Sequence, residues 1–394
     1  MQYSSLLLKS GRDRSVTNRH PWIFSGAVKQ LPSAQDGDIV AVRDNHGALL
    51  GYGFFSPRSQ IVVRMFAFTT QELSIDQHYW NRKIQDAFAL RKAHLDFAET
   101  TCYRLLHAEG DFLPGVIVDV YGSVAVMQLM IRGTERIHAA LLEALRTVGI
   151  EKVWLKNKEA AQRLEDVRLP NGWLTDLSEE GPAVVVRENG LQFAVDYERG
   201  QKTGFFLDQR ENRALLQQVA KGAKVLNAFS YTGGFSVYAL AGGATEVHSV
   251  DISQEAVERA HENVVLNYGS DAPHRTFAED CFKYLKNMEE SYNIIILDPP
   301  AFAKNARAVP NATRGYKEIN LWAFRKVQPG GLVFTFSCSQ NIDRDLFRKV
   351  VFGAAADAGR NVRILHQLTQ PLDHPVNIYH PEGEYLKGLV LYVS

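Results

Sequence analysis

The chain has few cysteines and no excess of charge of either sign. Its 394 residues include three cysteines, Cys102, Cys281 and Cys338, whose wide spacing argues against a disulfide framework or a structural zinc site. We therefore expect a reducing environment, with the cytoplasm as the location and no bound metal. Basic and acidic residues balance at 44 each, so any RNA-binding surface must be a local patch.

Long hydrophobic stretches are missing as well. No apolar run reaches the roughly 18 to 20 residues of a membrane span, and the first 14 residues lack the apolar segment of a signal peptide. Insertion into a membrane and export are therefore not expected. The composition, 45% hydrophobic and 22% charged, is that of a soluble protein with two or three domains and a full core.

Basic side chains gather near the N-terminus around a single acid, Asp13; they are Lys9, Arg12, Arg14, Arg19, His20 and Lys29. Short β-like runs follow at 38–43, 48–55 and 60–67, separated by turn residues, and predict a small β-barrel. The basic face is either a solvated surface or an RNA-docking surface that contacts backbone phosphates. The residues alone leave both interpretations open.

The pattern divides the chain into three predicted parts. The β-rich part spans residues 1–72. A second part, 73–198, opens with a connector helix at about 76–95 and continues as an α+β region, in which we identify no catalytic constellation. The third part, 199–394, carries the motifs discussed below.

Strands alternate with helices from residue 224 onward, which is typical of a parallel sheet covered on both faces. Helices are predicted at 235–241 and 254–267. Seven strands are predicted, at 224–229, 246–251, 275–278, 292–298, 331–337, 362–367 and 386–393. The fold class is therefore α/β, with a seven-stranded, doubly wound sheet.

A glycine turn follows the first of these strands. Gly233 and Gly234 open a helix, and their missing side chains would let a ligand approach the backbone. Asp251, Asp280 and Asp298 follow successive strands, where ligands bind in open α/β sheets. The combination predicts a nucleoside site, with Asp251 on the ribose hydroxyls and Asp280 on the adenine amine. S-adenosylmethionine suits the site better than NAD, because the full dinucleotide motif for a pyrophosphate is absent.

The strand at 292–298 ends in Asp298, Pro299 and Pro300. Two prolines stiffen this exit and leave main-chain carbonyls outside a helix, where they can hold the edge of a planar base. Methyltransferases that act on exocyclic amines use a related exit, so this motif does not choose the target atom. That choice depends on Cys338.

Cys338 follows the next strand, forty positions after Asp298. Carbon 5 of a pyrimidine is a poor nucleophile, and a thiolate that adds to carbon 6 turns it into an enamine-like centre able to accept a methyl group. Asp298, protonated or hydrogen-bonded to the base, would stabilise the adduct. The alternative is that Cys338 is a small buried hydrophobic residue.

These motifs resemble the bacterial 23S ribosomal RNA 5-methylcytosine methyltransferases of the large-subunit methyltransferase I type, over the whole chain. The matching segments are RHPWIFSG (19–26), YRL (103–105) with LPG (113–115), KTGFFLDQR (202–210), NAFSYTGGF (227–235), DPPAF (298–302), RGYK (314–317), FSCS (336–339) and EGEYLKG (382–388). The resemblance implies a PUA-like RNA-binding domain, a central α+β domain and a Rossmann-like methyltransferase domain.

The resemblance also implies that the segment around Thr203 helps to enclose the cofactor. The full predicted cofactor set is Thr203, Phe206, Asp208, Arg210, Asn227, Phe229, Tyr231, Thr232, Gly233, Gly234, Asp251, Ile252, Asp280, Cys281 and Asp298. The predicted catalytic residues are Cys338 and Asp298. The predicted RNA-binding residues are Arg12, Arg19, His20, Lys304, Arg314 and Lys317.

Two departures from the family pattern limit this transfer. Position 301 is alanine where family members often carry lysine, and the second cysteine that many RNA 5-methylcytosine enzymes place beside the proline motif is absent. The base that removes the carbon 5 proton is therefore not identified. Candidates for that role or for phosphate contacts are Lys304, Arg314, Lys317, Asp373 and His374.

The leading hypothesis is an S-adenosylmethionine-dependent enzyme that forms 5-methylcytosine in large-subunit ribosomal RNA through Cys338, on a flipped or unpaired base. One alternative is an amino-group methyltransferase for guanine or adenine. Another is a non-catalytic RNA-binding assembly factor. The sequence leaves open which nucleotide is modified, whether naked RNA or an assembly intermediate is the substrate, and whether the chain forms a homodimer.

Overall fold

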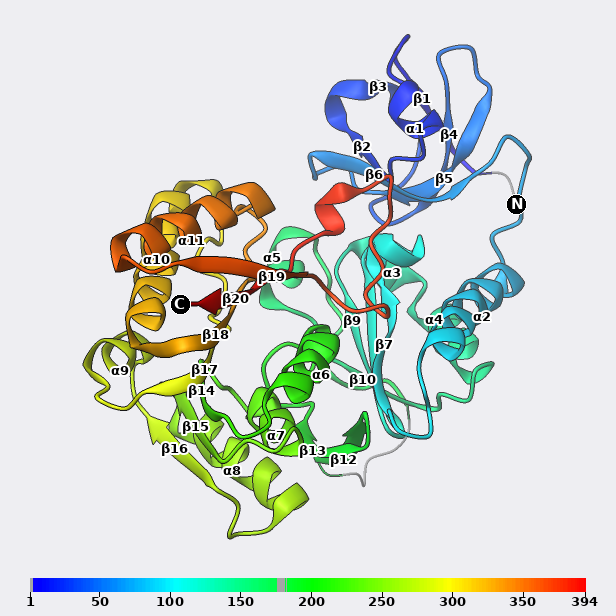
Figure 1. Ribbon diagram of the computed structural model, residues 1–394. Coiled ribbons are helices and arrows are strands. Elements are labelled where there is room, and N and C mark those ends of the chain that lie inside the picture. The colour runs from blue at the N-terminus through cyan, green and yellow to red at the C-terminus, as the bar shows by residue number, and fades with distance from the viewer. Residues whose placement is uncertain (1–2, 176–180, 182) are drawn as a thin grey trace. The chain divides into compact units, whose positions relative to one another are not determined.

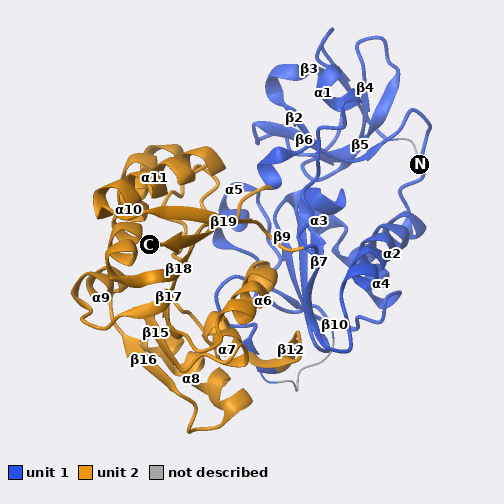
Figure 2. Cartoon of the chain, viewed as in Figure 1, with its two compact units in different colours: residues 1–184, 195–204, 372–383 blue, residues 185–194, 205–371, 384–394 orange. Residues whose placement is uncertain are grey.

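The computed structural model describes residues 3–175, 181 and 183–394. Contacts divide the chain into two compact units (Figure 2). Unit 1 comprises residues 1–184, 195–204 and 372–383, and unit 2 comprises 185–194, 205–371 and 384–394. The division into three parts at 72 and 198 stays a prediction.

Unit 1 begins with a six-stranded mixed sheet among its described residues (Figure 1). The strand order is β2 (Trp22–Phe24), β6 (Ile61–Phe68), β5 (Leu49–Phe55), β4 (Ile39–Arg43), β1 (Ser5–Leu8) and β3 (Val28–Gln30). β1 runs parallel to β4, and the other pairs are antiparallel. The three predicted β-like runs are thus confirmed as β4, β5 and β6, and the helical turn α1 (Arg14–Thr17) carries part of the N-terminal basic group.

A second sheet of unit 1 has the order β11 (Gly172–Trp173), β10 (Lys152–Leu155), β9 (Val124–Leu129), β8 (Val116–Tyr121) and β7 (Cys102–His107). Besides α1, the described residues of this unit form the helices α2 (Gln77–His94), α3 (Arg132–Arg136), α4 (His138–Arg146) and α5 (Glu159–Leu164). The predicted connector helix is α2, and the Asp76 side chain caps it by accepting a hydrogen bond from the Tyr79 backbone. Phe54, Trp80 and Leu105 belong to one apolar core that joins both sheets and α2.

The segment 372–383 belongs to unit 1 although it lies near the end of the chain. The Asp373 carboxylate accepts a hydrogen bond from the Arg104 backbone N–H, and the Arg91 guanidinium donates to the Asp373 carbonyl. Arg91 also forms a bidentate ion pair with Asp111. These buried, charge-assisted contacts hold the segment to β7 and α2.

Unit 2 contains a seven-stranded sheet, as predicted. The strand order among its described residues is β16 (His274–Ala278), β15 (Glu246–Asp251), β14 (Lys224–Ala228), β17 (Tyr292–Leu297), β18 (Val327–Ser337), β20 (Lys387–Val393) and β19 (Val362–Leu368). The expectation of a parallel sheet is wrong for β20, which runs antiparallel to both of its neighbours. An added antiparallel strand near the edge is common in doubly wound sheets.

Helices cover both faces of this sheet (Figure 1). On one face, α9 (Cys281–Asn287), α10 (Val309–Lys326) and α11 (Arg344–Ala358) share a core with Leu226 and Ile295. On the other, α6 (Arg210–Val219) and α7 (Gly234–Ala241) share a core with Val225 and Ile294, and α8 (Gln254–Tyr268) packs beside α7. Neighbouring residues on a strand point to opposite faces, so strands buried on both faces read as continuous apolar runs.

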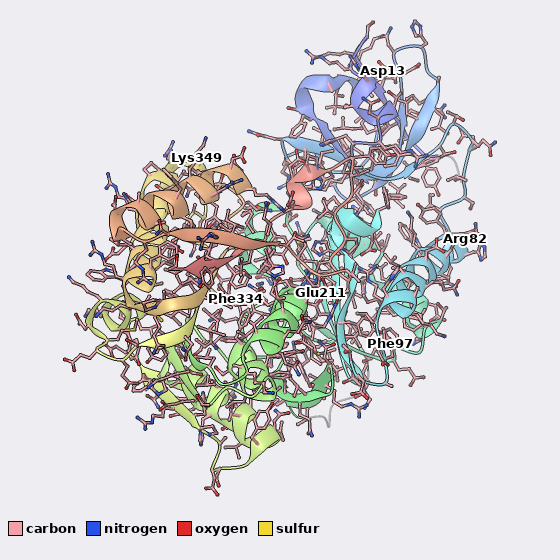
Figure 3. The ribbon with its side chains drawn as sticks, in the orientation of Figure 1. Asp13, Arg82, Phe97, Glu211, Phe334 and Lys349 are labelled. Atoms are coloured by element: carbon pink, nitrogen blue, oxygen red, sulfur yellow. The ribbon has the colours of Figure 1, made fainter. Side chains whose placement is uncertain are left out.

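A short hairpin of β12 (Ala183–Glu188) and β13 (Leu191–Asp196), of which residues 185–194 belong to unit 2, was not predicted from the sequence pattern. Figure 3 draws the side chains, with Phe334 of β18 fully buried and Lys349 of α11 exposed. None of the described helices is long and apolar enough to cross a membrane.

Candidate functional site

The predicted site residues of unit 2 lie just beyond the carboxyl ends of adjacent strands. In the register, Ala228 of β14 pairs with Val250 of β15 and with Leu297 of β17, and Leu297 pairs with Thr335 of β18. Asp251, the last residue of β15, and Asp298 and Cys338, which directly follow β17 and β18, therefore come together at one edge of the sheet. Ligands of open α/β sheets bind at this edge.

The turn between β14 and α7 holds an unusual backbone. Phe229 and Tyr231 have φ angles of 60° and 45°, in the left-handed region that non-glycine residues rarely adopt. The Tyr231 N–H donates to an Asp251 carboxylate oxygen at 3.0 Å, which helps to hold this conformation. Strained residues of this kind cluster at ligand sites, because the surrounding structure must stabilise them.

The two glycines of the turn are required by packing against neighbouring residues, whereas the sequence predicted that they allow close approach of a ligand. A Cβ atom on Gly233, whose φ is +77°, would lie 2.8 Å from the Ala260 Cβ. A Cβ atom on Gly234 would lie 3.1 Å from the Arg213 Cδ. Gly233 thus lets α7 start against α8, and Thr232, which precedes it, accepts a hydrogen bond at its carbonyl from Asn263 of α8.

Asp251 and Asp280 are half-buried and already carry backbone contacts. Asp251 accepts from the Tyr231 and Ser253 N–H groups at 3.0 and 3.1 Å, and Asp280 caps α9 by accepting from the Lys283 N–H at 3.0 Å. These contacts fix where the carboxylate oxygens point. Ile252, the next residue in the predicted set, is 73% exposed.

Two polar atoms buried at the end of β14 lack a hydrogen-bond partner among the described residues. They are the Asn227 Oδ1 and the Ser230 Oγ, and the Asn227 amide nitrogen donates to the Ser236 Oγ at 2.9 Å. Buried polar atoms normally have partners, so unsatisfied ones indicate a place for ligand or water. This observation fits a polar cofactor at the edge formed by β14 and β15.

Cys281 is buried at the start of α9. Its sulfur accepts a hydrogen bond from the Phe229 N–H at 3.2 Å and donates to the Val250 carbonyl. Burial raises the pKa of the Cys281 thiol to about 12, so the group stays protonated. Cys281 therefore braces the strained turn.

The segment around residues 203–210, which the resemblance assigned to the cofactor, crosses between the units. Thr203 belongs to unit 1, where its hydroxyl donates to Asp119 at 2.5 Å. Phe206 belongs to unit 2, with its ring edge-on to Tyr231 at a centroid distance of 5.1 Å. Asp208 accepts from the Tyr385 hydroxyl at 2.8 Å, and Arg210 is buried at the start of α6.

Cys338 lies beside the Asp298-Pro299-Pro300 exit. Its sulfur is 4.0 Å from the Pro299 carbonyl oxygen, and its side chain is half-buried, whereas Cys281 is buried. The Ser339 Oγ accepts from the Ala303 N–H at 3.2 Å, which ties the segment after β18 to the segment after β17. The structure thus brings the predicted nucleophile and the predicted base-binding exit together.

Tyr316 of α10 is hydrogen-bonded to the residues on either side of Cys338. Its hydroxyl lies 3.1 Å from the Ser337 Oγ and 3.0 Å from the Ser339 Oγ, on either side of Cys338. Burial raises the pKa of Tyr316, so its hydroxyl stays protonated and available for hydrogen bonds. The ring also packs against Phe302 at a centroid distance of 4.6 Å. Tyr316 lies in the RGYK segment, but nothing in the sequence pattern assigned it a role.

Lys387 is a charged residue at this edge that sequence reasoning missed. It pairs with Ser337 across β18 and β20 and is buried, and its Nζ donates to the carbonyls of Ser339 at 2.7 Å and Tyr385 at 2.8 Å. Burial lowers the pKa of Lys387 to about 8, and the nearby Cys338 opposes that shift. The only sequence signal was a lysine within the EGEYLKG segment.

The predicted RNA-binding residues differ in their surroundings. Arg12, Arg19, Lys304 and Arg314 are exposed. Lys317 forms an ion pair with Asp357 of α11 at 2.8 Å. In unit 1, the His20 Nε2 lies 3.7 Å from a Glu382 carboxylate oxygen, and the His20 Nδ1 accepts from the Trp22 N–H.

Asp373 and His374, two candidates for the base or for phosphate contacts, are both only 1% exposed. The His374 Nδ1 lies 3.0 Å from an Asp373 carboxylate oxygen within unit 1. A phosphate contact requires access to solvent, so this burial argues against that role. Their position in the Arg91 and Arg104 network gives them a structural function.

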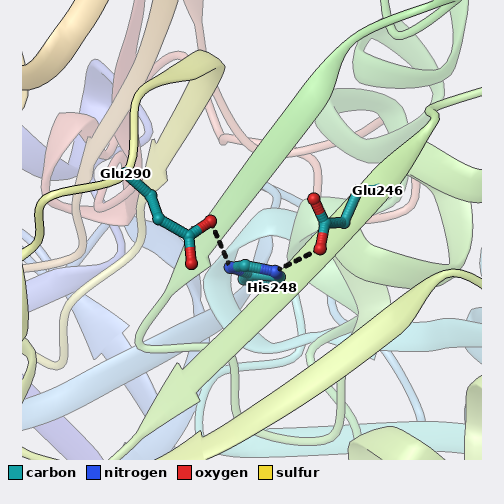
Figure 4. A group of neighbouring side chains, drawn as sticks. All are labelled: Glu246, His248 and Glu290. Carbon is teal, nitrogen blue, oxygen red and sulfur yellow. Dashed lines mark hydrogen bonds and ion pairs between the residues drawn. The ribbon is translucent and has the colours of Figure 1, made fainter.

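A separate titratable group lies at the opposite end of the strands, where β15 begins. The buried His248 contacts Glu246 through Nε2 at 2.9 Å and Glu290 through Nδ1 at 3.8 Å (Figure 4). Lys224 bridges the same carboxylates, contacting Glu246 at 2.9 Å and also Glu290. Hydrogen bonds from Lys224 and His248 lower the pKa of Glu246 to about 2. A lysine thus already neutralises the carboxylates, so the group is an ion-pair network.

Two protein families match separate parts of the chain. Residues 104–378 match the family of S-adenosylmethionine-dependent methyltransferases, and residues 6–68 match the PUA-like domain family. A protein named ribosomal RNA large subunit methyltransferase I from Alteromonas mediterranea is 42% identical over 99% of both chains. This chain belongs to the ribosomal RNA large subunit methyltransferase I family. It is therefore an S-adenosylmethionine-dependent methyltransferase, and the predicted cofactor is confirmed.

Further relatives agree. The protein of the same name from Escherichia coli is 40% identical over 97% of this chain and 98% of its own length. Among solved structures, a putative methyltransferase from Streptococcus mutans is 25% identical, with a TM-score of 0.83 over 99% of this chain and all of its own. A structure of a putative methyltransferase complexed with SAH is also 25% identical, with a TM-score of 0.84 over the same shares. The α/β fold with a PUA-like N-terminal domain is thus confirmed.

Proposed function

We propose that this methyltransferase forms 5-methylcytosine in large-subunit ribosomal RNA through a covalent adduct between Cys338 and carbon 6 of the base. The observation that carries the proposal is the position of the Cys338 sulfur, half-buried and 4.0 Å from the Pro299 carbonyl oxygen at adjacent strand ends. The relatives are named as ribosomal RNA large subunit methyltransferases, which supports ribosomal RNA as the substrate.

The residues of unit 2 have distinct parts in this reaction. The Cys338 thiolate forms a bond to carbon 6, and the electron pair of the former double bond makes carbon 5 nucleophilic. S-adenosylmethionine supplies an electrophilic methyl group. After transfer to carbon 5, a base removes the carbon 5 proton, the bond between sulfur and carbon 6 breaks, and the double bond returns. Asp298 and the Pro299 carbonyl hold the polar edge of the base while this occurs.

The cofactor is proposed to bind across the ends of β14 and β15. Asp251 and Asp280 hold the ribose and adenine, and Asn227 and Ser230 offer their unsatisfied buried oxygens. The strained turn with Phe229 and Tyr231 shapes the floor of the site. The remaining predicted cofactor residues, including Thr203 and Arg210, stay part of this proposal.

RNA recognition is proposed to use the exposed basic residues of both units. In unit 1 these are Arg12 and Arg19 on the PUA-like domain, and in unit 2 they are Lys304 and Arg314. Such contacts go to phosphates, so they position the RNA without reading its sequence. The three-part domain division, the cytoplasmic location and a homodimer remain predictions.

The proposal is tested with unmodified 23S ribosomal RNA and methyl-labelled S-adenosylmethionine, with the labelled nucleosides identified by mass spectrometry. Wild type should give labelled 5-methylcytidine, and Cys338→Ala should give none while binding the cofactor normally in calorimetry. Label on an exocyclic amine that persists in Cys338→Ala would instead support an amino-group methyltransferase. If neither protein transfers label, an assembly intermediate is tested next, and failure there with intact cofactor binding would favour an assembly factor.

A further inference from the structure

Lys387 places a buried cation at the sheet edge that carries Cys338. The two chain segments are adjacent strands, and the register sets Lys387 of β20 opposite Ser337, the residue before Cys338. Its Nζ donates at 2.7 Å to the carbonyl of Ser339, the residue after Cys338. The ammonium group is thus fixed at the residue after Cys338, while the Lys387 backbone pairs with the residue before it.

The ammonium group of Lys387 is buried and hydrogen-bonded to two neutral acceptors. The residue is 4% exposed, and two of its three N–H donors go to the Ser339 and Tyr385 carbonyls. Burial of a charge is unfavourable unless opposite charge or good acceptors compensate. Two carbonyls satisfy hydrogen bonds but carry no full charge, so a nearby anion would stabilise the group further.

The charged and titratable groups around Lys387 come from three elements. They are Cys338 after β18, Glu384 before β20, and Asp343 and Arg344 at the start of α11. Glu384 forms an ion pair with Arg344, and Asp343 caps α11 by accepting from the Leu346 N–H. The carboxylates therefore have partners of their own, which leaves Cys338 as the group whose charge state Lys387 can set.

We propose that Lys387 is a positioning residue that stabilises the thiolate form of Cys338 and so activates it for addition to the base. The inference deepens the proposed function and rests on Cys338 being the nucleophile. A cation beside a cysteine lowers the pH at which the thiolate forms, and the thiolate is the reactive species. The electrostatic interaction acts on both groups. Burial lowers the pKa of Lys387, and Cys338 raises it, as expected if each group favours the charged form of the other.

The test measures the rate at which iodoacetamide alkylates Cys338 as a function of pH, with mass spectrometry of the modified peptide, in the full chain without RNA or cofactor. Lys387→Gln keeps amide N–H donors for the carbonyls but removes the charge, and Lys387→Arg keeps the charge. We expect Lys387→Gln to move the midpoint of the profile upward by about one unit, a roughly tenfold slower reaction at pH 7. Lys387→Arg should stay within about threefold of wild type.

Two outcomes would overturn the inference. The first is a Lys387→Gln profile that superimposes on that of wild type. The second comes from an experiment without a Lys387 variant, in which the thiolate absorbance of Cys338→Ala is subtracted from that of wild type at each pH. The difference should have its midpoint at a pH below the ordinary cysteine pKa of about 8.5. A midpoint at or above that value would exclude activation by Lys387, even if Lys387→Gln failed to fold.

The same measurement separates this inference from the proposed function. A charge-dependent shift in alkylation together with labelled 5-methylcytidine supports both. A shift without any methyl transfer to cytosine would retain the electrostatic effect of Lys387 on Cys338 and reject the proposed reaction. Transfer to cytosine without a shift would retain the reaction and reject the role of Lys387.

Discussion

Cys281 and Cys338 occupy comparable places in unit 2 and have different surroundings. Both follow strands of the same sheet, Cys281 after β16 and Cys338 after β18. The Cys281 sulfur is buried and hydrogen-bonded to Phe229 and Val250, and its thiol has a pKa raised to about 12. Cys338 is half-buried between the Pro299 carbonyl and a segment held by Lys387. The comparison shows that folding gives two residues of the same type different exposure and different hydrogen-bond partners.

Replacement of each cysteine by alanine gives the largest expected contrast. Cys338→Ala should lower kcat for methyl transfer by at least about 10³-fold, because the proposed nucleophile is lost. Cys281→Ala should mainly raise KM for the cofactor, because the turn that carries Phe229 loses a hydrogen-bond acceptor. Steady-state kinetics with labelled cofactor measures both, and Cys102→Ala in unit 1 is the control. A kcat loss in Cys281→Ala as large as that in Cys338→Ala would break the comparison.

Alkylation of the native protein at pH 8.5 should distinguish the two thiols by about a hundredfold or more in rate. A pKa of about 12 leaves Cys281 protonated at this pH, and its thiolate fraction rises only as the pH approaches 12. Cys338 should react readily. Peptide mass spectrometry with and without denaturant provides the readout, since denaturant should make both sites reactive. Equal labelling of Cys281 in the native protein would contradict the burial argument.

Asp251→Asn should weaken cofactor binding by about tenfold to a hundredfold, because the proposed charged acceptor for ribose hydroxyls, which also accepts from the Tyr231 N–H, is lost. Calorimetry with S-adenosylmethionine measures the effect. Asp271→Asn, at an exposed position before β16, is a matched control and should bind normally. Unchanged affinity in Asp251→Asn would move the cofactor away from the ends of β14 and β15.

Alanine substitutions at two glycines flanking β14 should have the smallest effects, which are on the free energy of unfolding. Gly222 and Gly233 have φ angles of +72° and +77°, but a Cβ atom on Gly222 would meet nothing within 4 Å, whereas one on Gly233 would lie 2.8 Å from the Ala260 Cβ. Gly222→Ala should cost about 1 kcal/mol for backbone strain alone. Gly233→Ala should cost about 1 to 3 kcal/mol more through overpacking. Denaturant unfolding measures the difference, and equal losses would show that α8 yields to the added methyl group.

Much of the α/β fold was predictable because its signals are local. The predicted strand at 246–251 coincides with β15, and those near β14, β16 and β17 agree within one residue. The three helices α9, α10 and α11 were not predicted, although α10 and α11 are 18 and 15 residues long. Their apolar residues face the sheet core only once the strands are in place, so the pattern alone gave a weak signal.

The candidate site was predictable where it follows strand ends and unpredictable where it depends on distant pairing. Asp251 ends a parallel strand, Asp298 and Cys338 each follow one, and parallel strands end at the same edge. Lys387 belongs to the antiparallel strand β20, so it reaches that edge from the start of its strand. Tyr316 reaches the same edge from α10.

The sequence by itself determined the family, the alternation of strands and helices, and the acidic and cysteine residues at strand ends, because these are features of residue type and spacing. Only the tertiary structure decided that β20 is antiparallel, that segment 372–383 packs in unit 1, and that the glycines of the turn serve packing against α8 and Arg213. It also set the different environments of Cys281 and Cys338. The reason is physical: burial, strain and the energy of a charge depend on neighbours that are far away in the chain and come close only on folding.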